Sequence, residues 1–317
     1  MDFWKRAQEL KDEITQNRRR IHQNAEVGLN LPNTKAFVME KLREYGLKPT
    51  ECGHGVTATL GKPGKTLLLR ADMDALPMPE ESGEPFACPT GETAHACGHD
   101  MHTAMLLTAA KMLKENEDAL CGTVKLMFQP AEETFEGARD MLENGLLENP
   151  PVDAALAYHV AAGKSPVGFV MYNDSGVMMA SVDGFEITVH GRGSHGANPN
   201  LAIDPINVGV HIHLALQELI ARESDPTKTC VLTIGQFMAG TAANIIPDTA
   251  VLRGTIRTND KVAERVPSAM MYLGAGYMDE RGQYTAHNPK VVFNEGVLPI
   301  GAACMAHCAV EWLKENA

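Results

Sequence analysis

The chain has 317 residues, and its 28 Lys and Arg residues against 40 Asp and Glu residues give a formal net charge of −12 at pH 7. This acidic balance argues against binding to nucleic acid or to an anionic membrane surface. A hydrophobic fraction of 44% and a charged fraction of 21% exclude a disordered or fibrous chain and provide for a sizeable core.

The cysteine content and the N-terminal sequence predict a cytoplasmic location. The seven cysteines form no short-spaced disulfide framework, as expected of a protein in a reducing compartment. The segment 1–20 is charged throughout and lacks the apolar centre of an export signal. No apolar run approaches the roughly 18 residues of a membrane helix.

In chain order, the first half alternates helices with strands. Phe3, Ala7, Leu10 and Ile14 recur at helical spacing and predict a helix at the N-terminus. The elements expected after it are helices at 33–45, 101–115 and 136–143 and strands at 56–60, 66–70, 123–128 and 154–160. This alternation predicts an α/β fold with a mainly parallel sheet covered by helices.

A second unit begins at Val182, where apolar and polar residues start to alternate as in a sheet with one face in water. The elements expected there are a helix at 204–222 and strands at 230–237 and 248–258. This β-α-β-β order predicts an incomplete α+β lid of ferredoxin-like type, because a split β-α-β-β-α-β module needs one more helix and strand.

The chain then returns to the first unit. A strand is expected at 269–276 and a terminal helix at 300–314. We therefore expect one domain made of 1–181 and 267–317, interrupted by a smaller inserted domain at 182–266.

Polar residues follow three of the strands expected in the first unit. ADMDALP (71–77) and QPAEE (129–133) each follow a strand, and His159 lies at the end of another. The loop HACGHDMH (95–102) adds three His, one Cys and one Asp in front of a helix. Because the carboxyl ends of parallel strands form the ligand crevice of such sheets, we expect these groups to converge.

Cys97 and His99 flank Gly98, and a thiolate and an imidazole across a tight turn suit zinc or another late transition metal. Taken alone, the two residues would fit a structural role as well as a metal site. In the structural role, Cys97 would be a buried apolar thiol and His99 a hydrogen-bonded loop histidine. The carboxylates and His159 at neighbouring strand ends favour a metal site.

Two pairs of acids accompany this loop. Glu132 and Glu133 are adjacent, so in an extended loop their side chains point in opposite directions, and one can bind metal while the other acts on a water. The alternative is a pair of solvated acids before a helix. Asp74 is suited to accept a hydrogen bond from a ligating imidazole. Alternatively, Asp72 and Asp74 are a pair of turn-forming acids before Pro77.

Other kinds of catalytic site fit the sequence less well. A nucleophilic Cys97 with a histidine base would leave Glu132, Glu133 and His159 without a role. A serine nucleophile has no G-x-S-x-G elbow, and GRGSHG (191–196) lies in the second unit. No GxGxxG or Walker sequence follows a strand, so nucleotide cofactors have no support.

Nine stretches resemble the metal-dependent aminoacylase and carboxypeptidase family, in particular its hippurate hydrolases and auxin–amino-acid conjugate hydrolases. They are RRRIHQNAEVGLN (18–30), LLLRADMDALPMPEE (67–81), HACGHDMHTAMLL (95–107), GTVKLMFQPAEE (122–133), AYHV (157–160), GRGSHGANPN (191–200), NIIPD (244–248), GTIRT (254–258) and HNPKVVFNE (287–295). The resemblance implies two divalent metal ions, Zn or Mn, and a smaller lid domain that usually dimerises.

The resemblance also implies roles for single residues. The implied metal ligands are Cys97, His99, Glu133, His159 and His287, with Cys97 bridging the two ions. Glu132 would be the general base and Asp74 the acid that orients a ligand.

In the lid, the resemblance implies that His195 of a partner subunit donates to the carbonyl oxygen of the substrate. Asn244 and Arg257 would hold the carboxylate of the substrate, and their alternatives are a turn amide before Pro247 and a surface arginine. We expect three further histidines to be structural: His102, His211 and His213.

The reaction implied is metal-dependent hydrolysis of an N-acetyl, N-benzoyl or indole-acyl amino acid to a carboxylic acid and an amino acid. In relatives a further helix and strand follow GTIRT, whereas AERVPSAMMYLGAG (263–276) here leads directly back to the first unit, so we infer an internal deletion in the lid. Two alternatives stay open. One is a catalytically impaired metal-binding relic, and the other is a hydrolase with Cys97 as nucleophile.

Overall fold

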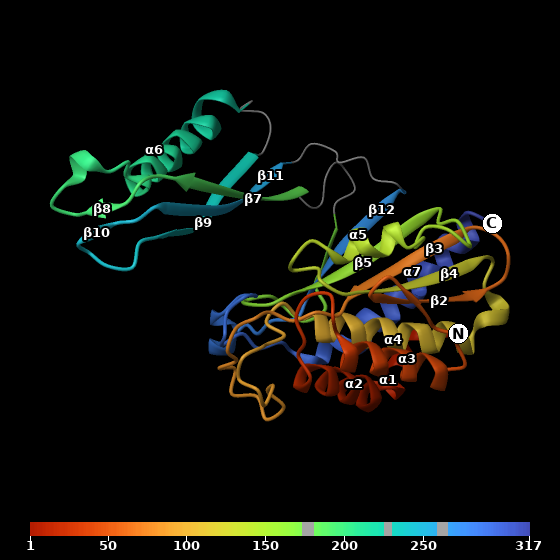
Figure 1. Cartoon of the computed structure of the whole chain (residues 1–317). Coiled ribbons are helices and arrows are strands. Elements are labelled where there is room, and N and C mark those ends of the chain that lie inside the picture. The colour runs from red at the N-terminus through yellow and green to blue at the C-terminus, as the bar shows by residue number, and fades with distance from the viewer. Residues whose placement is uncertain (173–180, 225–229, 259–265) are drawn as a thin grey trace. The chain divides into compact units, whose positions relative to one another are not determined.

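The computed structural model describes residues 1–172, 181–224, 230–258 and 266–317. The chain divides into a larger unit, residues 1–174 with 265–317, and a smaller inserted unit, residues 175–264 (Figure 1). Every helix and strand expected from the sequence is present. The expected N-terminal helix is two helices, because the backbone leaves the helical conformation at Leu10.

The larger unit is built on a seven-stranded sheet with a parallel centre. Its strands are β1 (Thr50–Cys52), β2 (Gly55–Gly61), β3 (Thr66–Asp72), β4 (Thr123–Gln129), β5 (Ala154–Ala161), β6 (Val170–Tyr172) and β12 (Ser268–Gly274). Their order in space is β1-β2-β4-β3-β5-β12-β6. Strands β4, β3, β5 and β12 run parallel, and the pairs at both edges are antiparallel. The prediction of a mainly parallel sheet is confirmed for these central strands.

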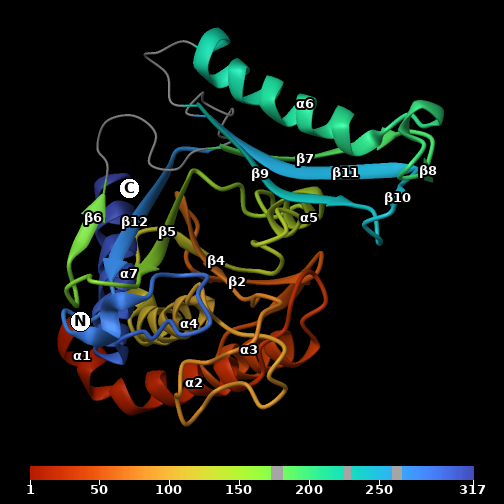
Figure 2. The ribbon, with the colours of Figure 1, turned by 90° about the vertical axis from the view of Figure 1, so that its left-hand side faces the viewer.

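Helices cover both faces of this sheet. They are α1 (Phe3–Glu9), α2 (Lys11–Gln23), α3 (Pro32–Glu44), α4 (His99–Glu115), α5 (Gly137–Glu143) and α7 (Leu298–Glu315). Leu67 and Leu69 of β3 pack in the core formed with α1 to α4 and α7, whereas Leu68 packs with Met141 of α5. Figure 2 shows α1 to α4 on one side of the sheet and α5 on the other.

Helix α7 corrects one expectation from the sequence. The helical stretch Glu295–Glu315 has 21 residues and contains an 18-residue window with a mean hydropathy of 1.4, so by length and composition alone it could cross a membrane. This is weak support for a membrane helix, because 61% of its apolar window is buried inside the protein, as in the core helix of a globular unit.

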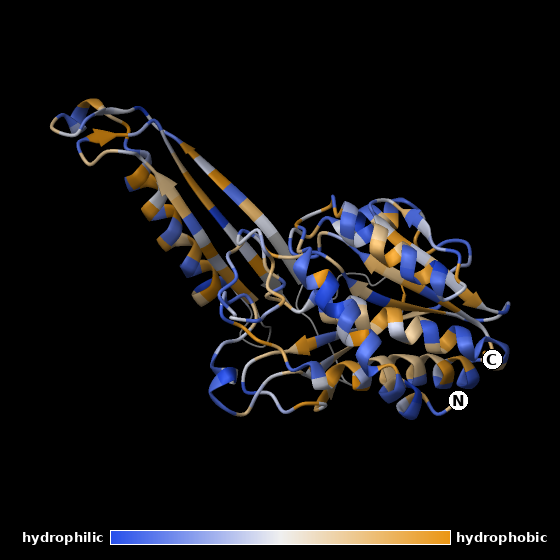
Figure 3. Cartoon of the chain, turned by 90° about the horizontal axis from the view of Figure 1, so that it is seen from below, coloured by the Kyte–Doolittle hydropathy of each residue, from blue (hydrophilic) through white to orange (hydrophobic). Residues whose placement is uncertain are grey.

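The smaller unit is a three-stranded antiparallel sheet with one helix on it. Its elements are β7 (Ser181–His190), β8 (Ser194–His195), α6 (Pro205–Glu218), β9 (Cys230–Ala239), β10 (Ile245–Ile246) and β11 (Thr249–Thr258). The order β7-β11-β9 confirms the expected β-α-β-β arrangement, and Val189, Ala250 and Leu252 form its core. The hydrophobic and hydrophilic residues that alternate along these strands are visible in Figure 3. Among the described residues of this unit, α6 has no second α-helix beside it.

Candidate metal centre

The loops that carry the predicted ligands meet at the carboxyl ends of the parallel strands. The ligand atoms of four three-residue groups each lie within 4.8 Å of one another: Cys97, His99 and His159; Cys97, Glu133 and His287; His99, Glu132 and Glu133; and Asp72, His99 and His102. The first two groups contain all five ligands that the resemblance implies. The structure thus brings those five side chains together.

Cys97 lies at the centre of this cluster and belongs to two of the groups. Its Sγ atom is 3.4 Å from Nε2 of His159 and 3.2 Å from Nε2 of His287. Nε2 of His287 is also 3.3 Å from Oε1 of Glu133. One thiolate therefore faces two sets of nitrogen and oxygen donors, as a sulfur shared between two metal ions would.

His99 is oriented by Asp74. Its Nδ1 atom donates to the backbone oxygen of Asp74 at 2.9 Å, so Nε2 keeps its lone pair and faces the carboxylates of Glu132 and Glu133 at 4.0 and 3.8 Å. Asp74 also accepts a hydrogen bond from the backbone N–H of Glu133 at 3.1 Å. Asp74 thereby positions two predicted ligands, His99 of α4 and Glu133 of the loop after β4.

The donor set fits a divalent cation. In the part of the chain that the structure describes, Nε2 of His99 is buried and lacks a hydrogen-bond partner, which calls for a further group at the site. Burial lowers the pKa of His99, but Asp72 and Cys97 outweigh burial and raise it. The hydrogen bond to Cys97 and then Glu133 raise the pKa of His287 to about 10. Surroundings that favour the positively charged form of two imidazoles would also stabilise a metal cation. The ligand types present, thiolate, imidazole and carboxylate, suit zinc or manganese.

The backbone at the cluster is strained at two non-glycine residues. Ala131, directly before Glu132, has φ of 48°, and His287 has φ of 64°. Such conformations cost roughly 1–3 kcal/mol each and persist where the surroundings require them. Both place a charged or ligating side chain at this site.

Gly98 is required by its backbone conformation and by its neighbours. It precedes α4 with φ of 88°, and a Cβ atom there would lie 2.4 Å from Cγ2 of Val160. Helix α4 therefore begins at His99, two residues earlier than its apolar pattern predicts, and the ligand is the first residue of the helix.

Glu132 differs from the predicted ligands in its surroundings. It is absent from the two groups that share Cys97, and its side chain is 30% exposed. Burial and then the charge of Asp72 raise the pKa of Glu132. A carboxylate with a raised pKa beside the ligands is a better proton acceptor than an ordinary glutamate.

His102 is structural, as the sequence analysis expects. Its Nδ1 atom donates to Asp72 at 2.5 Å, and its Nε2 atom accepts from the backbone N–H of Val160 at 2.9 Å. Both ring nitrogens are therefore engaged, although His102 lies within ligand distance of the cluster. On α6, His211 is exposed and His213 is half-buried.

The sequence analysis missed a buried charged network behind the cluster. Its members are Arg18, His22, Glu80, Asp100 and Glu295. Asp100, directly after His99, accepts from Nε of Arg18 at 2.7 Å and lies 2.8 Å from Nδ1 of His22. The available signal was the charged motif RRRIH (18–22) in an amphipathic helix, which places Arg18 and His22 four residues apart on one face.

Stability should fall as the pH rises through the pKa of His22. Burial lowers this pKa, but hydrogen bonds to Asp100 and Glu80 outweigh burial and raise it from 6.5 to about 9. The stabilisation is therefore complete below the unfolded value and is lost as the pH rises through about 9. We expect metal-free protein to lose up to about 3 kcal/mol of unfolding free energy by this route.

The measurement is urea unfolding in steps from about pH 6 to about pH 10, compared with His22→Gln. The variant should lack this part of the decline, whereas His54→Gln, which changes an exposed histidine, should retain it. Equal pH profiles for the wild type and His22→Gln would contradict the assignment.

The structure brings His195 and Asn244 together in the smaller unit. His195 in β8 pairs with Ile245 in β10, and the backbone oxygen of Asn244 accepts from the N–H of Gly196 at 2.8 Å. Nδ1 of His195 accepts from the N–H of Ala197 at 3.1 Å, which leaves its exposed Nε2 as a donor.

Arg257 lies elsewhere in that unit. It is near the end of β11, where it pairs with Val182 and Val231, and its side chain lies outside the described part of the structure. Asn244 precedes β11, whereas Arg257 lies eight residues beyond Thr249, the first residue of that strand, which is roughly 27 Å at about 3.4 Å per residue. One copy of the smaller unit does not bring these two residues to one carboxylate.

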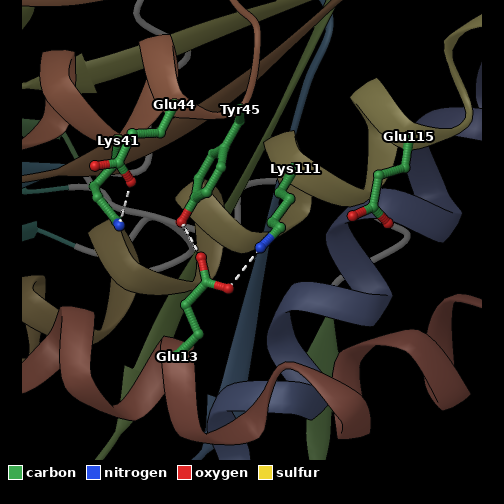
Figure 4. A pocket seen from close by; sticks show the side chains of 6 residues that line it. All are labelled: Glu13, Lys41, Glu44, Tyr45, Lys111 and Glu115. Atoms are coloured by element: carbon green, nitrogen blue, oxygen red, sulfur yellow. Dashed lines mark hydrogen bonds and ion pairs between the residues drawn. The ribbon is translucent and has the colours of Figure 1, made fainter.

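A hollow of about 490 Å³ on the helical face of the larger unit is a different feature (Figure 4). Its charged groups pair with one another: Glu13 accepts from Lys111 at 2.5 Å and from Tyr45 at 2.6 Å. Burial and then Glu13 raise the pKa of Tyr45, so its hydroxyl stays protonated. This hollow has the character of a surface ion-pair network rather than of a ligand site.

A thiolate, imidazole and carboxylate cluster at the carboxyl edge of a parallel sheet defines a metallohydrolase. The model of peptidase family M20/M25/M40 matches residues 68–311. The chain belongs to this family of hydrolases acting on amides, and the resemblance seen in the sequence is confirmed.

Three known proteins illustrate the relationship. Thermostable carboxypeptidase 2 of Saccharolobus solfataricus is 42% identical over 303 residues, which cover 93% of this chain and 75% of that protein. Hippurate hydrolase of Campylobacter jejuni is 40% identical over 268 residues, which cover 83% and 69%. A Bacillus subtilis structure described as a dinuclear metal-binding peptidase of the M20 family matches with a TM-score of 0.76 and 27% identity, over 98% of this chain and 100% of that one. The chain spans between 60% and 75% of the first curated relatives.

Proposed function

We propose that this protein hydrolyses the amide bond of N-acyl amino acids with the help of two divalent metal ions, zinc or manganese. The observation that carries the proposal is that Cys97 belongs to two ligand groups while Glu132 lies beside them, within reach of His99 and Glu133 but outside both groups that share Cys97. The carboxypeptidase and hippurate hydrolase relatives support the substrate class. A C-terminal peptide bond and an N-acyl amino acid share one chemical feature, an amide nitrogen that belongs to an amino acid with a free carboxylate.

The ligands would be divided between two halves that share Cys97. His99 and His159 complete one half, and Glu133 and His287 complete the other. When bound, the two ions would polarise the amide carbonyl and lower the pKa of water. Asp74 keeps Nδ1 of His99 protonated and directs Nε2 into the site.

Glu132 would perform the proton transfers. It accepts the proton of the attacking water and then delivers that proton to the nitrogen of the departing amino acid. Its raised pKa makes the carboxylate a stronger base for the first of these transfers. The products are a carboxylic acid and an amino acid.

The smaller unit would supply the remaining contacts. Nε2 of His195 is a donor suited to the developing charge on the carbonyl oxygen, and Asn244 and Arg257 suit the carboxylate of the substrate. Because His195 and Asn244 lie at the opposite end of β11 from Arg257, one substrate would contact all three only with residues from two copies. This supports a homodimer through the smaller unit, as do the exposed apolar residues Ile206, Val208, Val210 and Leu214 of α6, beside which the described part of the unit has no second α-helix.

The test is a substrate panel of N-acetyl, N-benzoyl and indole-acyl amino acids, together with an N-acyl dipeptide. We expect hydrolysis of the N-acyl amino acids with added Zn²⁺ or Mn²⁺, loss of activity with a chelator, and recovery on restoring the metal. Protein that binds two ions and hydrolyses none of these compounds would contradict the proposal and favour the impaired relic. A cytoplasmic location is part of the proposal, and cell fractionation checks it.

A further inference from the structure

A single buried arginine joins two distant parts of the chain. Arg18 of α2 is 2% exposed, and its Nε atom donates to Oδ2 of Asp100 at 2.7 Å. Its Nη1 atom donates to Oε1 of Glu295 at 3.0 Å. Burying a guanidinium is costly unless its donors are satisfied, so both carboxylates are needed to hold it there.

The first carboxylate is tied to one half of the ligand cluster. Asp100 follows His99 in the first turn of α4 and is fully buried. Fixing Asp100 therefore fixes the start of α4 and the turn that carries Cys97. His22 lies 2.8 Å from the same Oδ2 atom, so this carboxylate is held from two positions on α2.

The second carboxylate, that of Glu295, lies at the end of the segment 287–295. This segment begins with His287, a proposed ligand of the other half of the metal centre. The backbone N–H of His287 donates to the oxygen of Ala96 at 2.9 Å. Glu295 ends the segment and accepts from Arg18 inside the protein and from Arg19 at its surface. The left-handed backbone of His287 places its ring only while both ends of the segment are held.

We propose that Arg18 is a positioning residue that sets the two halves of the metal centre against each other. It does so by joining the segment of His99 to the segment of His287 through Asp100 and Glu295. The inference rests on the proposed metal centre, and it gives the motif RRRIH a role at that centre through contacts to Asp100 and Glu295 rather than to the ligands themselves. Lysine cannot replace it, because an ammonium lacks the planar fork that reaches two carboxylates at once.

The experiment is a titration of the metal-free full-length protein with Co²⁺, followed by calorimetry and by visible absorption. The wild type should bind two ions, with a thiolate-to-cobalt band from Cys97. Arg18→Lys should bind one ion with wild-type affinity and the other roughly 10- to 100-fold more weakly. The thiolate band should persist at one equivalent, because Cys97 also belongs to the half with His99 and His159.

The matched control is Arg19→Lys. Arg19 contacts the same Glu295 but is 46% exposed, so this variant should bind both ions as the wild type does. Glu295→Gln provides a second test should Arg18→Lys fail to fold, because Glu295 is 21% exposed and its loss removes only one end of the bridge. Glu295→Gln should also reduce the affinity for only one of the two ions.

Three results would overturn the inference. In the first, Arg18→Lys and Glu295→Gln bind both ions with wild-type affinity. In the second, these variants bind both ions with equally reduced affinity. Either outcome removes the positioning role while leaving the metal centre intact. A wild type that binds no Co²⁺ would instead refute the proposed metal centre, and the role of Arg18 with it.

Discussion

Replacing Glu132 with glutamine is expected to leave both metal ions bound and to lower kcat by about 10²- to 10⁴-fold. Glutamine keeps the shape of the side chain but cannot take a proton from water. The ligands are untouched, because Glu132 lies outside the two groups that share Cys97. Elemental analysis gives the metal content, and the N-acyl amino acid hydrolysed fastest by the wild type gives kcat.

Glu136→Gln is the control for this variant. Glu136 is an exposed acid that hydrogen-bonds Thr134 in the same loop, so its neutralisation should change neither metal content nor turnover appreciably. Undiminished turnover by Glu132→Gln would remove Glu132 from the mechanism. Loss of an ion would make Glu132 a ligand instead.

Cys97→Ala is expected to lose both metal ions and all measurable turnover. Its sulfur belongs to both ligand groups, so one substitution takes a donor from each ion. Affinity should fall by more than the roughly 100-fold that loss of an outer hydrogen-bond partner can cost. The measurement is metal content after dialysis against a defined concentration of free Zn²⁺.

Two comparisons sharpen this result. Cys88→Ala removes another buried cysteine, one whose sulfur lies near Thr90 and Thr93, and should retain both ions. His287→Ala removes a ligand from one group only and should retain one ion. A Cys97→Ala protein that keeps two ions and still loses turnover would support the nucleophilic cysteine, as would activity of the wild type in the presence of a chelator.

The sequence predicts most of the elements and the ligand cluster because both depend on local patterns. Apolar periodicity places the helices and strands, and polar loops directly after apolar strands indicate the edge where ligands meet. The start of α4 was less accurate, because Gly98 begins the helix before its apolar pattern does.

The network around Arg18 could not be predicted in the same way. Its bonds join residues 82 and 277 positions apart, and no local pattern pairs such charges. The separation of Asn244 from Arg257 was missed for a related reason. The motifs imply that both residues contact the substrate, but Asn244 precedes β11 and Arg257 lies near the other end of that strand.

The parallel pairing of β12 with β5 has a consequence for biosynthesis. Ser268 pairs with Ala155, so the smaller unit must be made between two neighbouring strands of one sheet. During translation the smaller unit, with its antiparallel strands close in sequence, can fold while the larger sheet still lacks β12, His287 and α7. The nascent chain therefore carries all three residues of the set Cys97, His99 and His159 while the set of Cys97, Glu133 and His287 still lacks His287. We expect this second set to close only after β12 has joined β5 and the segment of His287 has reached Cys97.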